Sequence, residues 1–358
     1  MSQERWQQAL KDSVTSVNQL VTHFQFDSRS LAAVVDKYPL RITPYYLNLI
    51  EQVGDPIWKQ CVPDLRELRE EGLVDPLAEE NLSPVPTIIH RYPDRVIFYV
   101  SGNCASYCRF CTRKRKVGCA DQGISFRELR DGIEYISEHS QIRDVIFSGG
   151  DPLLLPDSVL EDLLAKIHGI PHVEIIRIGT RIPVTLPERV TERLCEMLKK
   201  YQPLYLNTHF NHPRELTTEA AEACGRLADA GIVLGNQTVL LRDVNDRPEI
   251  LEELFRGLLR MRVRPYYLHQ MDLTRGTGHF RTSVQTGLDI MKSLRGPVSG
   301  LALPHYVIDL PGGKGKVPLV SQQVTRQGGM LLIKAADGSL VEYPDFPAEI
   351  EQQEPLFR

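Results

Sequence analysis

The sequence predicts an α/β protein built as a full or partial barrel of strands and helices, and three observations predict it. From residue 95 onward, short apolar runs typical of buried strands alternate with helical patterns. This regular alternation is typical of βα units that share a parallel sheet. The composition is that of a globular protein, with 42% hydrophobic and 25% charged residues. A chain of 358 residues also exceeds the usual size of one compact core, unless it closes into a barrel.

The segment before this alternation, residues 1–86, is expected to be helical. Apolar residues recur three or four positions apart from Trp6 to Phe24, which lines one face of a helix. Such a face either packs on its own protein or binds a partner, and the first interpretation is favoured. A second, short helix is predicted over residues 63–70. Three prolines then interrupt regular structure before the first strand, at Pro84, Pro86 and Pro93.

Residues 87–313 are expected to form the barrel core. Its strands are predicted at residues 96–100, 145–147, 173–178, 204–206, 232–234, 265–268 and, as a seventh, 305–308. Helices are predicted at 125–137, from 158, at 187–200, at 219–230, from 246 and at 284–294. Capping boxes, Ser125 with Glu128 and Ser158 with Glu161, predict two of the helix starts. In such barrels the chemistry takes place at the carboxyl ends of the strands.

Charge and hydropathy exclude several classes of protein. The formal net charge of −4 argues against a general nucleic-acid binder, which normally carries a basic excess. No apolar run approaches the length of a membrane span, so no membrane partner is expected. The first residues lack the basic and apolar regions of a signal peptide. We therefore expect a cytoplasmic protein, in which cysteine clusters indicate metal or catalytic sites rather than disulfides.

The strongest motif is a run of three cysteines, Cys104, Cys108 and Cys111, directly after the first strand of the barrel. Three thiolates can hold three irons of a [4Fe–4S] cluster and leave the fourth iron open to a small molecule. A zinc site is the alternative, but zinc usually takes four ligands and no second cysteine pair follows. The remaining cysteines are expected to be inert buried thiols: Cys61, Cys119, Cys195 and Cys224.

This C-x3-C-x2-C loop resembles the signature of the radical S-adenosylmethionine (SAM) superfamily. The resemblance implies a partial (β/α)6 barrel and a [4Fe–4S] cluster whose open iron binds SAM. A Gly-Gly-Asp turn follows the second strand and by itself would be only a turn. At that place it resembles the superfamily's segment that meets the SAM amino group, formed here by Ser148, Gly149, Gly150 and Asp151.

A glycine-lysine loop follows the candidate seventh strand, at residues 309–316. A lysine in such a loop can form a Schiff base, and pyridoxal phosphate (PLP) is the common aldehyde partner. From the local sequence alone, a flexible basic turn fits at least as well. Arg91 and Arg95 precede the first strand, where their guanidinium groups suit either a phosphate or solvent.

Together these features resemble the lysine 2,3-aminomutase family, over residues 83–115, 207–213, 279–282 and 309–316. The resemblance implies that Lys316, in a C-terminal segment over 314–358, carries PLP, with Lys314 as the second choice. Arg91 and Arg95 would hold the PLP, and Arg113 would pair with the substrate carboxylate. Asp272 and Asp309 would hold the far ammonium of L-lysine, whereas His209 and Gln237 would line the SAM pocket.

Within this family, catabolic members carry a longer C-terminal segment with zinc-binding cysteines, which we do not expect here. The chain more closely resembles the bacterial members that make (R)-β-lysine for a ligase to attach to elongation factor P. A flavodoxin-like electron donor is expected. The alternatives are a catabolic or biosynthetic lysine 2,3-aminomutase, a glutamate or arginine aminomutase, a nucleic-acid-modifying radical SAM enzyme, and an iron–sulfur electron carrier or elongation factor P binding module.

Overall fold

The structure is a computed structural model that describes residues 4–29, 31–118, 123–320, 324–327, 330–334 and 339–344. Its main body is a nine-stranded sheet with the strands in sequence order, β1 to β9. Strands β2 to β8 are parallel, and β1 and β9 pair antiparallel at the two edges. The strands are β1 (Ile88–Tyr92), β2 (Arg95–Ser101), β3 (Asp144–Gly149), β4 (Ile175–Gly179), β5 (Leu204–Thr208), β6 (Val233–Leu240), β7 (Arg264–Gln270), β8 (His305–Leu310) and β9 (Gly315–Pro318).

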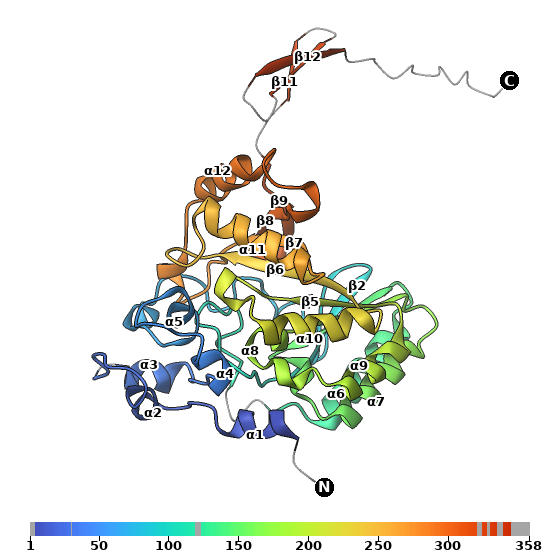
Figure 1. The fold of residues 1–358 in the computed structure, drawn as a ribbon. Coiled ribbons are helices and arrows are strands. Elements are labelled where there is room, and N and C mark those ends of the chain that lie inside the picture. The colour runs from blue at the N-terminus through green and yellow to red at the C-terminus, as the bar shows by residue number, and fades with distance from the viewer. Residues whose placement is uncertain are drawn as a thin grey trace, which may run out of the picture.

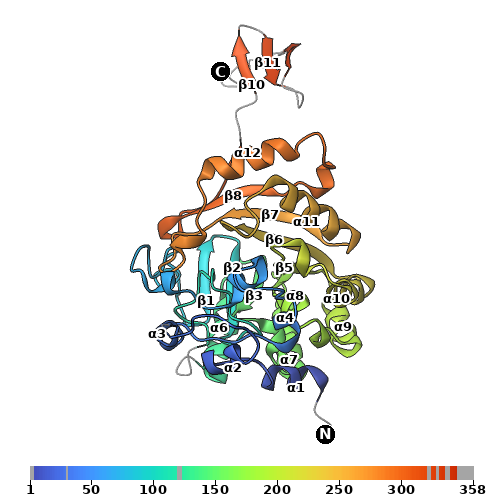
Figure 2. The ribbon, with the colours of Figure 1, turned by 60° about the vertical axis from the view of Figure 1, so that its left-hand side comes forward.

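The sheet curls into a nearly closed barrel with helices on its outer side (Figures 1 and 2). The two edges approach each other, since the Lys316 N–H on β9 donates to the Tyr92 hydroxyl on β1 at 3.0 Å. The barrel helices are α6 (Phe126–Glu138), α7 (Asp157–His168), α8 (Ile182–Thr185), α9 (Glu192–Leu198), α10 (Thr218–Asp229), α11 (Pro248–Arg260) and α12 (Val284–Leu294). The expected radical SAM type of partial barrel is thus confirmed in its architecture.

The N-terminal segment forms five short helices rather than one long one. They are α1 (Arg5–Lys11), α2 (Val17–Val21), α3 (Ala32–Lys37), α4 (Pro44–Leu47) and α5 (Pro56–Cys61). The periodic pattern from Trp6 to Phe24 is broken at Val14, which instead forms a β-bridge with Ile42. Trp6 and Leu20 are buried in the same core as the barrel. Within the described residues this apolar face therefore packs on its own protein.

Two further expectations about local structure are wrong. The helix predicted to begin at Ser158 begins one residue earlier, at Asp157. Pro156 occupies its N-cap position, and no side chain caps this end of the helix. The helix predicted over 187–200 is split, because α9 starts only at Glu192, capped by the Thr191 hydroxyl. By contrast, the Ser125–Glu128 capping box is present and opens α6 as predicted.

The alternation of side chains along the strands separates the core from the barrel interior. Val96, Phe98, Val145 and Phe147 are buried in the apolar core that the helices cover. The residues between them point to the inner face of the sheet and are only half-buried. The interior is therefore lined by accessible polar side chains, at Arg95, Tyr99, Asp144, Ser148, Arg177, Gln237, Tyr267 and His269.

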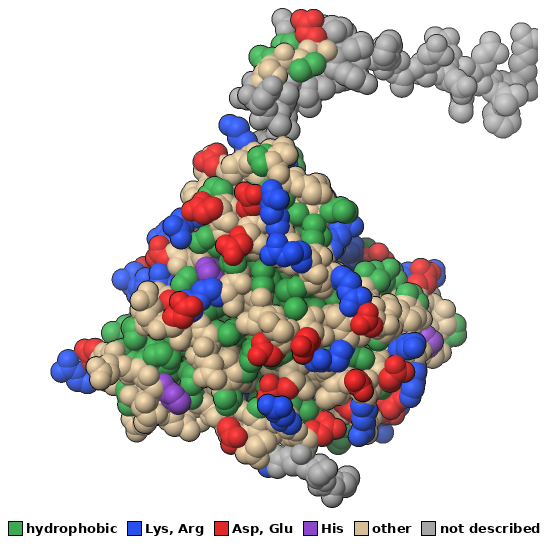
Figure 3. All heavy atoms as spheres, viewed as in Figure 1, with side chains coloured by type: hydrophobic (Ala, Val, Ile, Leu, Met, Phe, Trp, Pro, Cys, Tyr) green, Lys and Arg blue, Asp and Glu red, His purple; other side chains and the backbone are tan. Residues whose placement is uncertain are grey.

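In both views, α1 to α3 lie at one end of the main body and α12 at the other (Figures 1 and 2). A small antiparallel sheet follows the barrel, formed by β10 (Val324–Gln327), β11 (Met330–Lys334) and β12 (Leu340–Pro344). None of the described helices has the length and apolar character that crossing a membrane requires. On the face shown in Figure 3, basic and acidic side chains are interspersed.

Candidate active site

The cysteine loop begins where β2 ends, and the N-terminal segment holds it in place. The N–H of Tyr107 donates to the Arg41 carbonyl at 3.0 Å, and the N–H of Arg109 donates to the Gln60 carbonyl at 2.9 Å. Arg109 is almost fully buried and forms a salt bridge with the buried carboxylate of Glu67 at 2.6 Å. Lys114 contacts the same carboxylate at 2.8 Å. The loop is thus clamped on both sides of its last two cysteines.

The three cysteines of this loop carry free thiols and are partly buried. Burial raises the pKa of Cys111 to about 11 and the pKa of Cys104 well above its usual value. The described residues contain no group of three or more His, Cys, Asp or Glu side chains that could hold one metal ion. A [4Fe–4S] cluster does not require such a group, because each cysteine binds a different iron. Three partly buried thiols on one loop, with the Arg181 guanidinium beside Cys108, fit a cluster better than a single zinc ion.

The Gly-Gly-Asp turn packs backbone against backbone on the cysteine loop. Gly149 has a φ of +131°, and a Cβ at this position would lie 2.3 Å from the Ser101 carbonyl oxygen. The N–H of Gly150 donates to the same oxygen at 2.5 Å. Asp151 points away from this turn, because its carboxylate accepts hydrogen bonds from the Thr180 hydroxyl at 2.7 Å and from the Arg181 N–H at 2.8 Å. Burial raises the pKa of Asp151 to about 6.

His209 directly follows β5, and Gln237 lies on the adjacent strand β6, where Asn236 pairs with Thr208. The His209 ring lies 5.4 Å from the ring of Phe110, a residue of the cysteine loop. Its Nε2 contacts the Asn211 amide oxygen at 3.1 Å. Burial lowers the pKa of His209 well below its usual value, and the charges of Arg181 and His269 lower it further. The ring is therefore neutral and faces the cysteine loop.

Arg113 joins the Gly-Gly-Asp turn to a buried carboxylate. Its guanidinium forms a salt bridge with Glu79 at 2.7 Å, and its Nη1 donates to the Ser148 hydroxyl at 3.0 Å. The Glu79 side chain is 3% exposed. Glu79 thus fixes the direction of a guanidinium that the sequence had assigned to a substrate carboxylate.

Lys316 and Asp309 lie opposite each other in the antiparallel β8–β9 pair. The Lys316 Nζ is 2.5 Å from one Asp309 oxygen, and Arg91 Nη1 is 2.6 Å from the other. Lys314, two positions earlier, is exposed. Gly312, Gly313 and Gly315 have positive φ angles, and at Gly313 a Cβ would lie 2.6 Å from a Leu82 methyl carbon. The glycine run thus forms a tight turn that directs Lys316, and not Lys314, to this carboxylate.

Asp272 lies after the end of β7, near Asp309. Its carboxylate accepts a hydrogen bond from the Thr112 hydroxyl at 2.8 Å. Burial raises the pKa of Asp272 to about 6, and the charge of Asp309 contributes to the rise while the Thr112 hydrogen bond opposes it. The neighbouring carboxylates of Asp272 and Asp309 therefore form a site that favours a cation.

Arg95, which the sequence analysis grouped with Arg91, contacts Tyr92 and Asp94 rather than Asp309. Its guanidinium lies 4.5 Å from the Tyr92 ring and forms a salt bridge with Asp94 at 3.2 Å. Burial raises the pKa of Tyr267 on β7, and the charges of Arg177 and Arg95 oppose that rise. The charge of Arg95, on β2, therefore also affects Tyr267 in the barrel interior.

Three residues of this site were missed by the sequence reasoning, namely Glu79, Arg177 and His269, and for Arg181 that reasoning left open whether it contacts SAM or only packs. His269 lies on β7, and burial together with the charge of Lys316 lowers its pKa to about 3. Arg177 forms a salt bridge with Asp144 inside the barrel at 2.6 Å. Arg181 and His269 follow or end predicted strands, so the rule that chemistry lies at carboxyl ends could have indicated them. The position of Glu79 carried no such signal.

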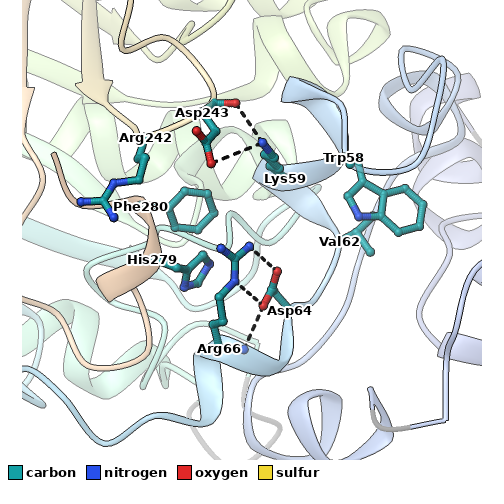
Figure 4. A pocket seen from close by; sticks show the side chains of 10 residues that line it. Trp58, Lys59, Val62, Asp64, Arg66, Arg242, Asp243, His279 and Phe280 are labelled. Atoms are coloured by element: carbon teal, nitrogen blue, oxygen red, sulfur yellow. Dashed lines mark hydrogen bonds and ion pairs between the residues drawn. The ribbon is translucent and has the colours of Figure 1, made fainter.

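A small cavity of about 90 Å³ lies beside the cysteine loop and outside the predicted site (Figure 4). His279 and Phe280 face Lys59, Asp64 and Arg66 across it. The Phe280 ring packs against Phe110 at 6.2 Å. Ion pairs between residues of the cavity wall, Lys59–Asp243 and Arg66–Asp64, balance most of its charge.

Comparison with known proteins agrees with this geometry. Residues 98–255 match the radical SAM superfamily, and residues 291–354 match the lysine-2,3-aminomutase family. The chain is 48% identical over 348 residues to an L-lysine 2,3-aminomutase of Methanococcus maripaludis, covering 95% of this chain and 80% of that relative. It is 46% identical over 348 residues to an L-lysine 2,3-aminomutase of Fusobacterium nucleatum, with 95% and 82% covered. A glutamate 2,3-aminomutase of Clostridioides difficile is 43% identical over 351 residues, with 96% and 83% covered.

Proposed function

This chain belongs to the lysine 2,3-aminomutase family of radical SAM proteins, and from that premise we propose that it isomerises L-lysine to (R)-β-lysine by moving the amino group from C2 to C3. The observation that carries the proposal is the contact between Lys316 and Asp309. A primary alkylammonium already lies against the carboxylate that would receive the far ammonium of the substrate.

The first part of the proposal concerns the cluster and SAM. Cys104, Cys108 and Cys111 would ligate three irons of a [4Fe–4S] cluster, which with SAM supplies a 5′-deoxyadenosyl radical. The backbone of Ser148, Gly149 and Gly150 would receive SAM, because this turn lies directly against the cysteine loop. Asp151 would not contact SAM but would stabilise that turn, because its carboxylate accepts hydrogen bonds from Thr180 and Arg181. His209 and Gln237 would line the pocket, with His209 neutral and able to donate or accept a hydrogen bond.

The second part concerns PLP. When bound, this cofactor supplies an aldehyde that carries the migrating nitrogen. Lys316 would hold it, because its side chain points to the interior whereas Lys314 is exposed. Arg91 and Arg95, from the two strands of the β1–β2 hairpin, would supply positive charge for its phosphate. His269 would remain neutral beside Lys316 and so would not repel it.

The third part concerns the substrate. Asp272 and Asp309 would fix the far ammonium of L-lysine, and Arg113 would pair with its carboxylate in the direction that Glu79 sets. Holding both ends positions C3 for hydrogen abstraction, and such positioning is the protein's main contribution to the rate. Two acidic groups at the far end attract an ammonium and repel a carboxylate. Lysine is therefore favoured over glutamate, the amino acid in the name of the Clostridioides difficile relative.

The destination of the product is a separate part of the proposal. The family resemblance supports delivery of free (R)-β-lysine to the ligase that modifies elongation factor P, with a flavodoxin-like protein as the electron donor. The buried free thiols support a reducing compartment, the cytoplasm. A catabolic or biosynthetic role that ends in free β-lysine is the second candidate, since the named relatives are lysine aminomutases that share most of this chain.

An anaerobic assay tests the activity. The enzyme is reconstituted with iron and sulfide, supplied with PLP, SAM and a reductant, and incubated with labelled L-lysine or L-glutamate. Chiral chromatography then separates α- from β-amino acids. We expect (R)-β-lysine and no β-glutamate, and none of either from Cys108→Ala. β-Glutamate without β-lysine, from enzyme that holds both cofactors, would refute the substrate assignment of Asp272 and Asp309.

A coupled assay tests the destination. Elongation factor P and its lysyl-transferring ligase are added to the active enzyme, and intact mass spectrometry reads the modification of elongation factor P. A mass increase that requires both the aminomutase and L-lysine supports this role. Free β-lysine production without any increase would leave the catabolic or biosynthetic role.

A further inference from the structure

Arg181 donates a hydrogen bond to a cysteine of the cluster loop. It follows β4 by two residues, and its Nη1 lies 2.8 Å from the Sγ of Cys108. The side chain is 9% exposed, so water screens this contact little. From the sequence alone, it was left open whether this residue contacts SAM or only packs.

The rest of the guanidinium group is held on every side. Nη2 lies within hydrogen-bond distance of three oxygen atoms: that of the Glu215 carboxylate at 2.8 Å, that of the Gln60 amide at 2.6 Å and that of the Tyr46 hydroxyl at 3.0 Å. Nε donates to the His209 carbonyl at 3.1 Å. Glu215 is fully buried and accepts further hydrogen bonds from the N–H groups of Asn211 and His212. The Arg181 guanidinium group is therefore fixed in one orientation, and that orientation directs Nη1 at the Cys108 sulfur.

The backbone of Arg181 extends this network to the turn that would receive SAM. Its N–H donates to Asp151, the residue directly after Gly150. One residue thus connects the cysteine loop, the Gly-Gly-Asp turn and the segment that carries His209. A shift of its side chain would alter the surroundings of the cluster without removing a ligand.

We propose that Arg181 sets the reduction potential of the cluster through its hydrogen bond to the Cys108 sulfur. A donor to a ligand sulfur stabilises the reduced cluster, which carries one more negative charge, and so raises the potential. Arg181 is a positioning residue in this role. The inference rests on the proposed function only as far as the cluster, and it involves neither PLP nor lysine.

The test replaces the donor while keeping the three cysteines. Arg181→Lys keeps the charge but loses the fork, and Arg181→Gln loses both. Because Arg181→Gln leaves Glu215 buried without its cation, the double variant Arg181→Gln/Glu215→Gln is made as well. Arg189→Lys is the matched control, since Arg189 is also fully buried and pairs with Asp157 and the Leu153 carbonyl, away from the cluster loop.

The readout is the midpoint potential of the reconstituted cluster, measured by an electron paramagnetic resonance redox titration without SAM, PLP or lysine, together with iron content. We expect the Arg181 variants to hold iron and to show at least a tenfold smaller ratio of reduced to oxidised cluster at a fixed potential. This corresponds to about 59 mV for one electron. Arg189→Lys should match the unmodified enzyme. An unchanged potential at full iron content would overturn the proposal, and loss of fold or iron from all Arg181 variants would overturn it in favour of a structural role.

Discussion

The Lys316 ammonium and the Asp309 carboxylate face each other across adjacent antiparallel strands, 2.5 Å apart. The second oxygen of the same carboxylate accepts a hydrogen bond from Arg91 on β1, the strand at the other edge of the sheet. One carboxylate thereby joins the two edges of the barrel. It also joins the residue proposed to hold PLP to the group proposed to hold the substrate.

Replacing Lys316 should abolish PLP attachment, and replacing Lys314 should not. Lys316 points to Asp309 inside the site, whereas Lys314 is exposed in the turn before β9. The absorbance band of PLP bound through a Schiff base is measured in Lys316→Ala and in Lys314→Ala. We expect the band to be lost only in the first variant. Loss of the band only in Lys314→Ala would exchange the two roles.

Lysine binding should weaken as the pH falls through about 6. Burial raises the pKa of Asp272 to about 6, so below this pH the carboxyl is protonated and neutral, and it no longer attracts an ammonium. For a single titrating group the KM for lysine should rise up to about tenfold for each pH unit below that value. Asp272→Asn should have a high KM that does not change between pH 5 and 8. A flat profile in the unmodified enzyme would contradict the role of Asp272.

Replacing Glu67 should destabilise the protein strongly. Burial alone would raise the pKa of Glu67, but Arg109 and Lys114 outweigh it and hold the pKa below its usual value. Glu67→Gln would leave two buried cations short of a partner, which costs on the order of 3–5 kcal/mol. The free energy of unfolding is measured by urea titration, with iron content as a second readout. Glu70→Gln is the control, because the Lys37–Glu70 pair is exposed, and its unfolding midpoint should change little.

A methyl group at Gly149 should impair SAM binding without unfolding the barrel. The Cβ of Gly149→Ala would lie 2.3 Å from the Ser101 carbonyl oxygen, at a φ of +131° that L residues rarely adopt. The turn must then move away from the cysteine loop. Gly300→Ala is the control, since a Cβ there would meet no atom within 4 Å. The Kd for SAM is measured by equilibrium binding to both reconstituted variants. An equal Kd in the two variants would show that this turn does not receive SAM.

The fold was largely predictable because the periodicity of strands and helices is a local property. The Ser125–Glu128 box marks α6 correctly, since both partners lie within one turn. The strand β1 was missed, because Pro86 and Pro93 on either side indicate irregular structure and the pairing partner of Ile89 is Ile97, across a turn. The strand β9 was missed because it is only four residues long and begins at a glycine, Gly315, so its strand pattern is weak.

The site was predictable only where a motif is contiguous. The three cysteines and the glycine-lysine loop lie within short segments, whereas Arg181 reaches Cys108 from 73 positions away. Such a contact depends on how the barrel brings the ends of β2 and β4 together, and no local pattern records that. Cys119 lies outside the described residues, while Cys61, Cys195 and Cys224 are buried as expected.

Because the inner face of the barrel is only half-buried, the stability of the fold is expected to depend on how much ligand is available. Side chains such as Tyr99, Arg177 and Tyr267 remain partly exposed there. A molecule that binds only the folded state there stabilises it by about 2.7 kcal/mol when present at 100 times its Kd. Cofactors and substrate would therefore complete the core as well as perform the chemistry. A cell short of iron or PLP would then hold less of this protein in the folded state, and degradation of the unfolded fraction would lower its abundance.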